Sequence, residues 1–330
     1  MKRPKTSVAV ATIVLGLVLA ACGSGGSGDS DASSELRIAA TGVDSLPFMA
    51  VLEVAEEKGW FKEEGLDVTF TSGSGGGNTL RTLSTGDADI AIAGGPAVVQ
   101  AAEQSNGGIK VIAPWFQVND FHWIAPASSN IDIKNASLGV TGAGSTTQLL
   151  GEYMKETTLP GIEVVELGGG MGDSWAAARG GSIDAGWAMH PFVTDKEKNE
   201  DAENILSARD EVGDFPADMV ATSADFASNN GKALKAFFRV AERVNNYVIG
   251  STDDAAKELS PILNIDDVDM LSDALRDTPD MKKAYSLNVD KKALETLSDL
   301  LVSNDVVSND VNWHKMLDQS YLPKDARADF

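Results

Sequence analysis

The residues that could bind a ligand lie in short glycine-rich loops that carry hydroxyl and amide groups but no lysine or arginine. Each loop follows an apolar run and precedes a helical pattern, so it places free backbone N–H groups at a helix start. Each start favours an anion by about 0.3 to 1 kcal/mol. Their sum falls short of the roughly 8.2 kcal/mol of micromolar binding, so side chains must supply the rest. Six starts are predicted, near Ser45, Asn78, Pro96, Ser145, Asp173 and Pro191.

These loops indicate a backbone-lined site for a sulfonate, carboxylate or phosphate. The alternative is that the polar side chains only cap helices. The predicted ligand contacts, in chain order, are Asp44, Ser45, Leu46, Gly76, Gly77, Asn78, Gly94, Gly95, Trp115, Phe116, Asp120, Ser145, Thr146, Thr147, Met171, Trp187, Met189 and His190.

The aromatic stretch 115–123 indicates a second kind of ligand. Its rings, with Trp187 and His190, could hold a flat heterocycle, although some of them must belong to the core. Asp44 and Asp120 could then accept hydrogen bonds from an amine or aminopyrimidine, or they could be solvated turn carboxylates. The sequence leaves an anion and a heterocycle as open alternatives.

Catalysis finds little support in the sequence. The three histidines, His122, His190 and His314, lack the spacing of an H-E-x-x-H metal motif. No G-x-S-x-G elbow and no phosphate loop with its lysine is present. We therefore predict no enzyme activity, no cofactor and no metal site.

An internal duplication predicts the architecture. The segment 36–104 is loosely repeated at 137–198, with the same spacing from a predicted cap to Gly, Asp and Pro. These positions are Asn78, Gly86, Asp89 and Pro96 in one half and Asp173, Gly181, Asp184 and Pro191 in the other. Alternating strands and helices predict an α/β fold of two lobes, each with a mostly parallel sheet flanked by helices. Ligands of such sheets bind beyond the carboxyl ends of the strands, which predicts a cleft between the lobes.

The N-terminus has the layout of a secreted lipoprotein. Three basic residues precede an uncharged apolar run that ends at Cys22, the only cysteine, which predicts a signal peptide over 1–21 and a lipid on that cysteine. Residues 22–34 are rich in Gly and Ser and form a predicted flexible tether. The protein is expected outside the cytoplasm, anchored to the outer face of the bacterial cell membrane.

The charge is strongly acidic. Without residues 1–21, 24 basic residues stand against 49 acidic ones, a net charge of −25. Nucleic acid is therefore excluded as a partner, and the acidity serves solubility. The remaining chain is long enough for two cores, and we expect a monomer.

Several motifs resemble a known family. Lys58-Gly-Trp-Phe-Lys-Glu-Glu-Gly-Leu-Asp-Val68, the glycine-rich loop before Asn78, Gly86-Asp-Ala-Asp89 and the segment 138–147 are similar to solute-binding proteins of ABC importers. The closest resemblance, over roughly 36–250, is to the family of sulfonate, taurine, nitrate and thiamine-pyrimidine-precursor binders. It implies the type 2 periplasmic-binding-protein fold, with 35–117 and 222–330 in the first lobe and 118–221 in the second.

The resemblance implies that the chain captures a small organic solute and delivers it to an ABC permease with its ATPase. An alkanesulfonate or taurine-like anion is favoured over a thiamine-precursor pyrimidine or another aromatic or heterocyclic solute. An enzyme of pyrimidine synthesis on the same fold is disfavoured, because that branch carries a Cys-rich segment that this chain lacks. A ligand-sensing surface lipoprotein is a further alternative.

Overall fold

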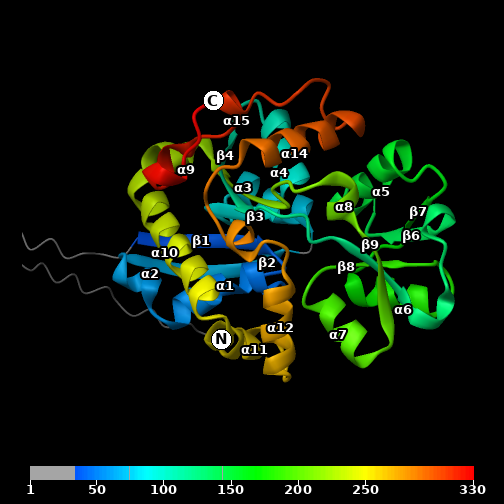
Figure 1. Cartoon of the computed structure of the whole chain (residues 1–330). Coiled ribbons are helices and arrows are strands. Elements are labelled where there is room, and N and C mark those ends of the chain that lie inside the picture. Colours follow the sequence, from blue (N-terminus) through cyan, green and yellow to red (C-terminus); the bar gives the residue numbers. More distant parts are fainter. Residues whose placement is uncertain (1–33, 74, 143) are drawn as a thin grey trace, which may run out of the picture. The chain divides into compact units, whose positions relative to one another are not determined.

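The computed structural model describes residues 34–330 except for positions 74 and 143 (Figure 1). The predicted signal peptide, the predicted lipid on Cys22 and the predicted tether up to residue 33 lie outside the described residues. Ser34, the last residue of that tether, begins the first strand. The described residues belong to one compact unit.

Five strands form the first sheet, in the order β2-β1-β3-β10-β4. β1 is parallel to β2 and β3, whereas β10 is antiparallel to β3 and β4. The first four residues of β3, Ile-Ala-Ile-Ala, are all buried, as expected for a strand covered on both faces. The strands are β1 (Ser34–Thr41), β2 (Leu66–Gly73), β3 (Ile90–Gly94), β4 (Ile109–Phe116) and β10 (Asp218–Ser223).

Helices alternate with these strands along the chain. The helices between β1 and β4 are α1 (Pro47–Glu57), α2 (Trp60–Glu63), α3 (Gly76–Thr85) and α4 (Gly95–Gln104). We call the part built on this sheet the first lobe and the part that contains β5 to β9 the second lobe.

The second lobe contains a three-stranded sheet, β8-β5-β9, and a parallel pair, β6-β7. A parallel bridge between Leu138 and Ala185 joins β6 to the residue just before β8. The elements are β5 (His122–Pro126), β6 (Ser137–Val140), β7 (Glu163–Glu166), β8 (Gly186–Ala188), β9 (Ala202–Ser207), α5 (Thr146–Thr157), α6 (Met171–Arg179), α7 (Phe192–Asn199), α8 (Ala208–Val212) and the 3-10 turns Ala127–Ser129 and Ile133–Asn135.

The predicted α/β class with mostly parallel strands is confirmed, and one strand in each of the two larger sheets runs against the others. β5 is antiparallel to both β8 and β9, as β10 is to β3 and β4. Each of these two strands is the first that the chain forms after passing from one sheet to the other. The arriving strand therefore enters its sheet in the opposite direction to the strand beside it.

The predicted duplication is visible as equivalent hydrogen bonds in the two lobes. The Asp89 carboxylate accepts from the Arg37 N–H at 2.9 Å, and the Asp184 carboxylate accepts from the Ser137 N–H at 2.7 Å. Each Asp also donates its own N–H to the carbonyl of the same partner residue. The aspartates thus tie the strand after the short helix to the first strand of each repeat.

The predicted second lobe, 118–221, extends too far at its end. Residues 218–221 lie in the first sheet as part of β10. Met219 and Val220 pair with Ala93 and Ile92 of β3. The chain therefore returns to the first sheet before residue 218. The position of this strand in the first sheet depends on the unpaired edges of β3 and β4, which lie far from it in the sequence.

The C-terminal helices pack largely on the first lobe (Figure 1). α10 contacts α1 and α2, and α11 contacts α1. α12 contacts α7, and α14 contacts α5, so these two helices also reach the second lobe. The elements are α9 (Ala224–Asn229), α10 (Gly231–Gly250), α11 (Thr252–Leu263), α12 (Val268–Asp277), α13 (Met281–Ala284), α14 (Lys291–Ser303), α15 (Trp313–Met316) and the 3-10 turns Gln319–Tyr321 and Lys324–Ala326.

Among the described residues, no helix has both the length and the apolar character needed to cross a lipid bilayer.

Candidate functional site

In the described residues of the two repeats, six helices begin within six residues of the carboxyl end of the preceding strand, as the duplication predicts. They are α1, α3 and α4 in the first lobe and α5, α6 and α7 in the second. Pro96 lies in the first turn of α4, and Pro191 is the N-cap of α7. The predicted positions of these two starts are confirmed.

Three of the residues predicted at helix starts do not occupy the N-cap position. α1 has Leu46 as its N-cap, and the exposed Ser45 hydroxyl makes a long contact, 3.4 Å, to the Gly42 carbonyl. α3 begins at Gly76 after Gly75, so Asn78 is already its third residue. In α6 the N-cap is Gly170, and Asp173 accepts from the Gly170 N–H instead. Before α3 and α6, glycines allow the chain to enter the helix earlier than the polar side chain suggests, whereas α1 begins one residue later than a Ser45 cap would place it.

Ser145 is the exception, because it caps α5 as predicted. Its Oγ accepts from the Gln148 N–H at 3.2 Å and lies 3.1 Å from Thr147 Oγ1. The buried Thr147 hydroxyl also accepts from the Thr141 N–H at 3.0 Å. These contacts fix the loop between β6 and α5 and leave Thr146 at the start of the helix.

The starts of α3 and α4 lie against each other at small residues. A Cβ on Gly76 would lie 2.9 Å from the Ala97 Cβ, and one on Gly73 would lie 1.9 Å from Thr79 Oγ1. The Thr79 hydroxyl is in turn 2.8 Å from that of Thr41, at the end of β1. Only glycine fits at these positions, so the glycine-rich loop serves close packing as well as access to its backbone.

The two lobes meet at the starts of α4 and α5. A Cβ on Gly94 would lie 3.1 Å from Thr146 Oγ1, so this hydroxyl lies beside the backbone that begins α4. The neighbouring Gly95 donates its N–H to the Ala217 carbonyl at 2.8 Å. The structure therefore brings together Gly94 and Gly95 of the first lobe and Ser145, Thr146 and Thr147 of the second.

A second group of predicted residues surrounds Asp120. Its Oδ2 accepts from the His190 N–H at 3.1 Å, and its Oδ1 lies 3.1 Å from His122 Nε2. The rings of Phe121 and Trp187 lie 6.5 Å apart. Beside them, the Met189 N–H lies 3.3 Å from the sulfur of Met171. Five of the predicted ligand contacts therefore gather near β8 and the segment that joins β4 to β5. They are Asp120, Met171, Trp187, Met189 and His190.

Asp44 contacts neither the residues at the starts of α4 and α5 nor the residues around Asp120. It is exposed and accepts a hydrogen bond from Ser72 at 2.7 Å, which ties the β1–α1 turn to the end of β2. Nearby Leu46, Gly77 and Asn78 are partly or fully exposed at the starts of α1 and α3. Of the two roles predicted for Asp44, this position corresponds to a solvated turn carboxylate.

Trp115 and Phe116 belong to the core of the first lobe. Trp115 donates its ring N–H to the Phe48 carbonyl at 2.8 Å, and Phe116 stacks on the Phe48 ring with centroids 4.0 Å apart. Both are at most 2% exposed. The two aromatics could not be assigned from the sequence because core and binding sites use the same residue types.

The electrostatics of the site are dominated by buried carboxyls. Among the described residues, the Asp120 carboxylate lies 3.1 Å from His122 Nε2 and 3.9 Å from His190 Nε2, and it forms an ion pair only with a protonated ring. Burial lowers the pKa of His190, although the Asp120 charge acts in the opposite direction. Burial also raises the pKa of Asp218 to about 7. Asp218 pairs with Gly94 in the sheet, so a buried acidic side chain lies beside the start of α4.

Two residues of the site, Asp218 and His122, were not among the predicted ligand contacts. Asp218 begins an otherwise apolar strand, and that was the available signal in the sequence. His122 lies within the aromatic stretch but joins Asp120 and His190 only through the fold. Among the described residues, the side chains of Asp120, His122 and His190 form a group whose atoms could hold a metal ion.

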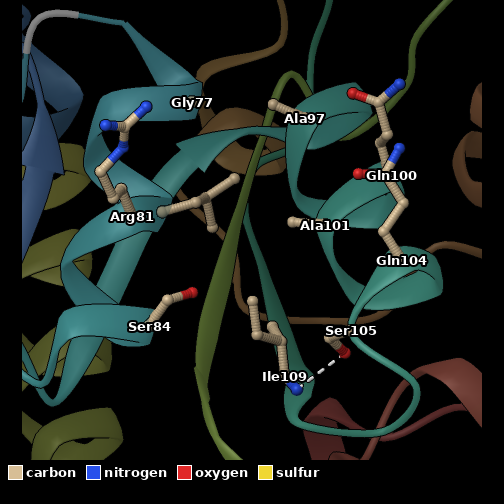
Figure 2. Close-up of a pocket in the computed structure, with 10 residues that line it drawn as sticks. Gly77, Arg81, Ser84, Ala97, Gln100, Ala101, Gln104, Ser105 and Ile109 are labelled. Atoms are coloured by element: carbon tan, nitrogen blue, oxygen red, sulfur yellow. Dashed lines mark hydrogen bonds between the residues drawn. The ribbon is translucent and has the colours of Figure 1, made fainter.

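An open cavity of about 400 Å³ lies elsewhere, between α3 and α4 (Figure 2). Arg81 and Ser84 of α3 and Gln100 and Gln104 of α4 contribute to its lining. Of the predicted ligand contacts, only Gly77 borders it. The cavity is therefore separate from the group around Asp120 and from the contact between Gly94 and Thr146.

Comparison with known proteins extends these findings. The family model described as NMT1/THI5 like matches residues 47–255. The chain is also similar to YtlA of Bacillus subtilis (strain 168), whose name provisionally calls it a binding protein. The two are 24% identical over 229 residues, which cover 64% of this chain and 67% of YtlA.

The fold is shared with solved structures, of which two serve as comparisons. One is the alkanesulfonate-binding protein SsuA from Xanthomonas axonopodis pv. citri bound to MOPS, with a TM-score of 0.67 at 14% identity, covering 86% of this chain and 97% of SsuA. The other is a Candida albicans protein with the generic periplasmic binding protein fold, with a TM-score of 0.66 at 17% identity, covering 88% of this chain and 98% of that one. The chain therefore has the periplasmic-binding-protein fold.

Proposed function

Because this chain belongs to the NMT1/THI5-like family, we propose that it is the solute-binding component of an ABC importer. It captures a small organic anion of the alkanesulfonate or taurine type between its two lobes and delivers it to the permease with its ATPase. The protein acts as a monomer, binds reversibly and carries out no reaction on the solute. The alkanesulfonate bound by the structural relative SsuA supports this choice of solute class.

The single observation that carries this proposal is the contact between the starts of α4 and α5. Thr146 of the second lobe lies against Gly94 of the first, and both follow the carboxyl ends of their strands. An acidic group placed there would meet the Thr146 hydroxyl and backbone N–H groups in the first turns of both helices, although not that of Gly95, which already donates to the Ala217 carbonyl. Binding it would therefore hold the lobes together.

A solute panel tests the proposal with the full chain in detergent. The panel contains alkanesulfonates, taurine, nitrate, aminopyrimidines and aromatic acids. A solute at about 100 times its dissociation constant should stabilise the fold by roughly 2.7 kcal/mol, which a thermal shift detects. A panel without a single 1:1 binder would remove the support for solute capture.

We expect Thr146→Val to weaken sulfonate binding about tenfold, because it removes one hydroxyl donor and keeps the size of the side chain. Thr157→Val is the matched control, since Thr157 lies exposed at the other end of α5 and bonds only to the Tyr153 carbonyl. Isothermal titration measures both. Equal affinities of the two variants would place the solute elsewhere.

A second solute class is favoured by the buried Asp120 carboxylate. It accepts hydrogen bonds and lies near Trp187 and Phe121, a setting that suits the amino group of an aminopyrimidine. The same panel separates the two classes. An aminopyrimidine that binds more tightly than every sulfonate, with loss of binding in Asp120→Asn, would replace the anion as the solute.

We further propose that a lipid on Cys22 anchors the protein to the outer face of the cell membrane. The apolar run before this single cysteine and the tether after it support the assignment. Cys22→Ser is expected to move the protein from the membrane fraction to the soluble or secreted fraction. Retention of the variant in the membrane fraction would exclude the lipid as the main anchor.

A further inference from the structure

Three side chains that could ligate a metal ion converge where the chain enters the second lobe. Asp120 precedes β5, His122 begins it, and His190 follows β8. Asp120 Oδ1 lies 3.1 Å from His122 Nε2 and 3.9 Å from His190 Nε2, and the three possible ligand atoms all lie within 4.8 Å of one another. Asp120 and His122 are buried, and the His190 side chain is 11% exposed, which leaves an approach from solvent.

Both imidazole rings are held from behind by a second polar group. His190 Nδ1 lies 2.8 Å from Thr194 Oγ1, and this hydroxyl donates to Asp277 at 3.3 Å. His122 Nδ1 lies 2.9 Å from the side-chain amide of Asn204. These contacts direct the Nε2 atom of each ring towards Asp120, an arrangement that is typical of metal-binding histidines.

The Asn204 amide has one buried polar atom, Oδ1, without a hydrogen-bond partner among the described residues. Rotation of the amide by half a turn would place this oxygen next to His122 Nδ1. The ring would then carry its proton on Nδ1 and a lone pair on Nε2. The site can thus present two imidazole lone pairs and one carboxylate oxygen.

We propose that Asp120, His122 and His190 form a binding site for a divalent transition-metal ion of the zinc class. Two imidazole nitrogens and one carboxylate oxygen suit zinc, cobalt or nickel. Bonds of about 2.0 to 2.2 Å to zinc require movements of less than about 1 Å from the present separations. Three protein ligands leave at least one coordination position open.

The open position has a use in solute capture, and this step rests on the proposed function. The helix starts and hydroxyls of the site offer an anion no lysine or arginine, and Asp120 and Asp218 place acidic groups near it. A bound divalent ion would supply the missing positive charge. In the metal-loaded protein the acidic group of the solute would take the open position and contact the metal directly, in place of its contact with the starts of α4 and α5.

The metal alone is the first probe. The full chain in detergent, treated with a chelator and then dialysed, is titrated with Co²⁺ and followed by its visible absorption, and with Zn²⁺ by calorimetry. We expect one equivalent of each metal to bind. The bound Co²⁺ should show the visible absorption that is typical of low-symmetry coordination by nitrogen and oxygen. The absence of a one-to-one complex would overturn the proposal.

Substitutions locate the site. His122→Gln and His190→Gln should each weaken Co²⁺ binding at least 100-fold, whereas His314→Gln, at the exposed third histidine in α15, should leave it unchanged. Thr194→Val should weaken binding about tenfold by loosening the His190 ring. Unchanged binding in both site variants, or an equal loss in His314→Gln, would assign the metal to another place. The far-ultraviolet spectrum and the unfolding midpoint show that each variant folds.

A second measurement separates the metal site from solute capture. Taurine and an alkanesulfonate are titrated into the protein with and without one equivalent of Zn²⁺, and at least a tenfold gain with Zn²⁺ is expected. Equal affinities would overturn the role of the metal in capture while leaving the importer function in place. One-to-one metal binding with no solute binding in either state would refute the proposed function and retain the metal site.

Discussion

The carboxyl group of Asp218 is buried in β10 between Gly94 and Phe116, its partners in the two neighbouring strands. No ion pair or hydrogen bond to another described residue offsets this burial, which raises its pKa from 3.8 to about 7. The folded protein therefore keeps a proton that the unfolded chain loses near pH 4. Stability arising from this group falls as the pH rises from about 4 to 7 and then stays constant.

Asp218→Asn removes this dependence. Relative to the unaltered protein, the variant should gain about 3 kcal/mol in unfolding free energy between pH 5 and pH 8, since each unit of pKa shift corresponds to about 1.4 kcal/mol. Urea unfolding at the two pH values measures the gain. Asp225→Asn, at an exposed position in α9, is the control and should show almost no difference. A gain below 1 kcal/mol for Asp218→Asn would mean that the carboxyl is ionised in the folded state.

Single residues were predicted well where a local constraint repeats. Asp89 and Asp184 were matched by spacing alone, and the structure gives them the same hydrogen bonds. Prediction failed where the same residue type serves two purposes. Trp115 and Phe116 pack in the core, and no property of their own sequence distinguishes them from Trp187, which lies near Asp120 with part of its surface exposed.

Helix starts show how far equivalent elements can differ. Ser45 and Ser145 occupy matching positions in the two repeats, yet only Ser145 caps a helix. In the first repeat, Pro47 begins α1 and Leu46 takes the cap position. The loop backbone, rather than the presence of a serine, decides where each helix begins. The positions of the caps could therefore be predicted only to within two or three residues.

Ser145→Ala should lower the unfolding free energy by about 1 kcal/mol, because the Gln148 N–H loses its acceptor. Ser45→Ala is the matched control and should change it by less than about 0.5 kcal/mol, since Ser45 is exposed and caps nothing. Urea denaturation of both variants gives the comparison. Equal losses would show that Ser45 stabilises its loop in a way that its recorded contacts do not explain.

Across the whole molecule, the helix pairs α7–α12 and α5–α14 connect the lobes in addition to the chain crossings and the contact between α4 and α5. The Thr194 hydroxyl of α7 donates to Asp277 of α12, and the Asn304 side chain after α14 donates to the Leu149 carbonyl of α5. The two-lobed α/β architecture was predicted from the duplication. These bridges were not, because they join residues whose proximity depends on how the C-terminal helices pack.

Asn304→Ala removes one bridge, and we expect the lobes to separate more often. Loss of about 1 kcal/mol would shift an equilibrium between joined and separated lobes about fivefold. Small-angle scattering should then show a larger radius of gyration without solute. Ser303→Ala is the control, because Ser303 bonds only within α14. The same radius in both variants would indicate that this hydrogen bond does not hold the lobes.

The place of β10 between β3 and β4 also governs the order in which the protein can be assembled. A growing chain has made β3 and β4 long before residue 218 leaves the ribosome. Until then each of these strands has an unpaired edge that can recruit other strands. A nascent or truncated chain that ends within the second lobe is thus exposed to aggregation, and a chaperone that covers such edges would be needed until residue 223 has been added.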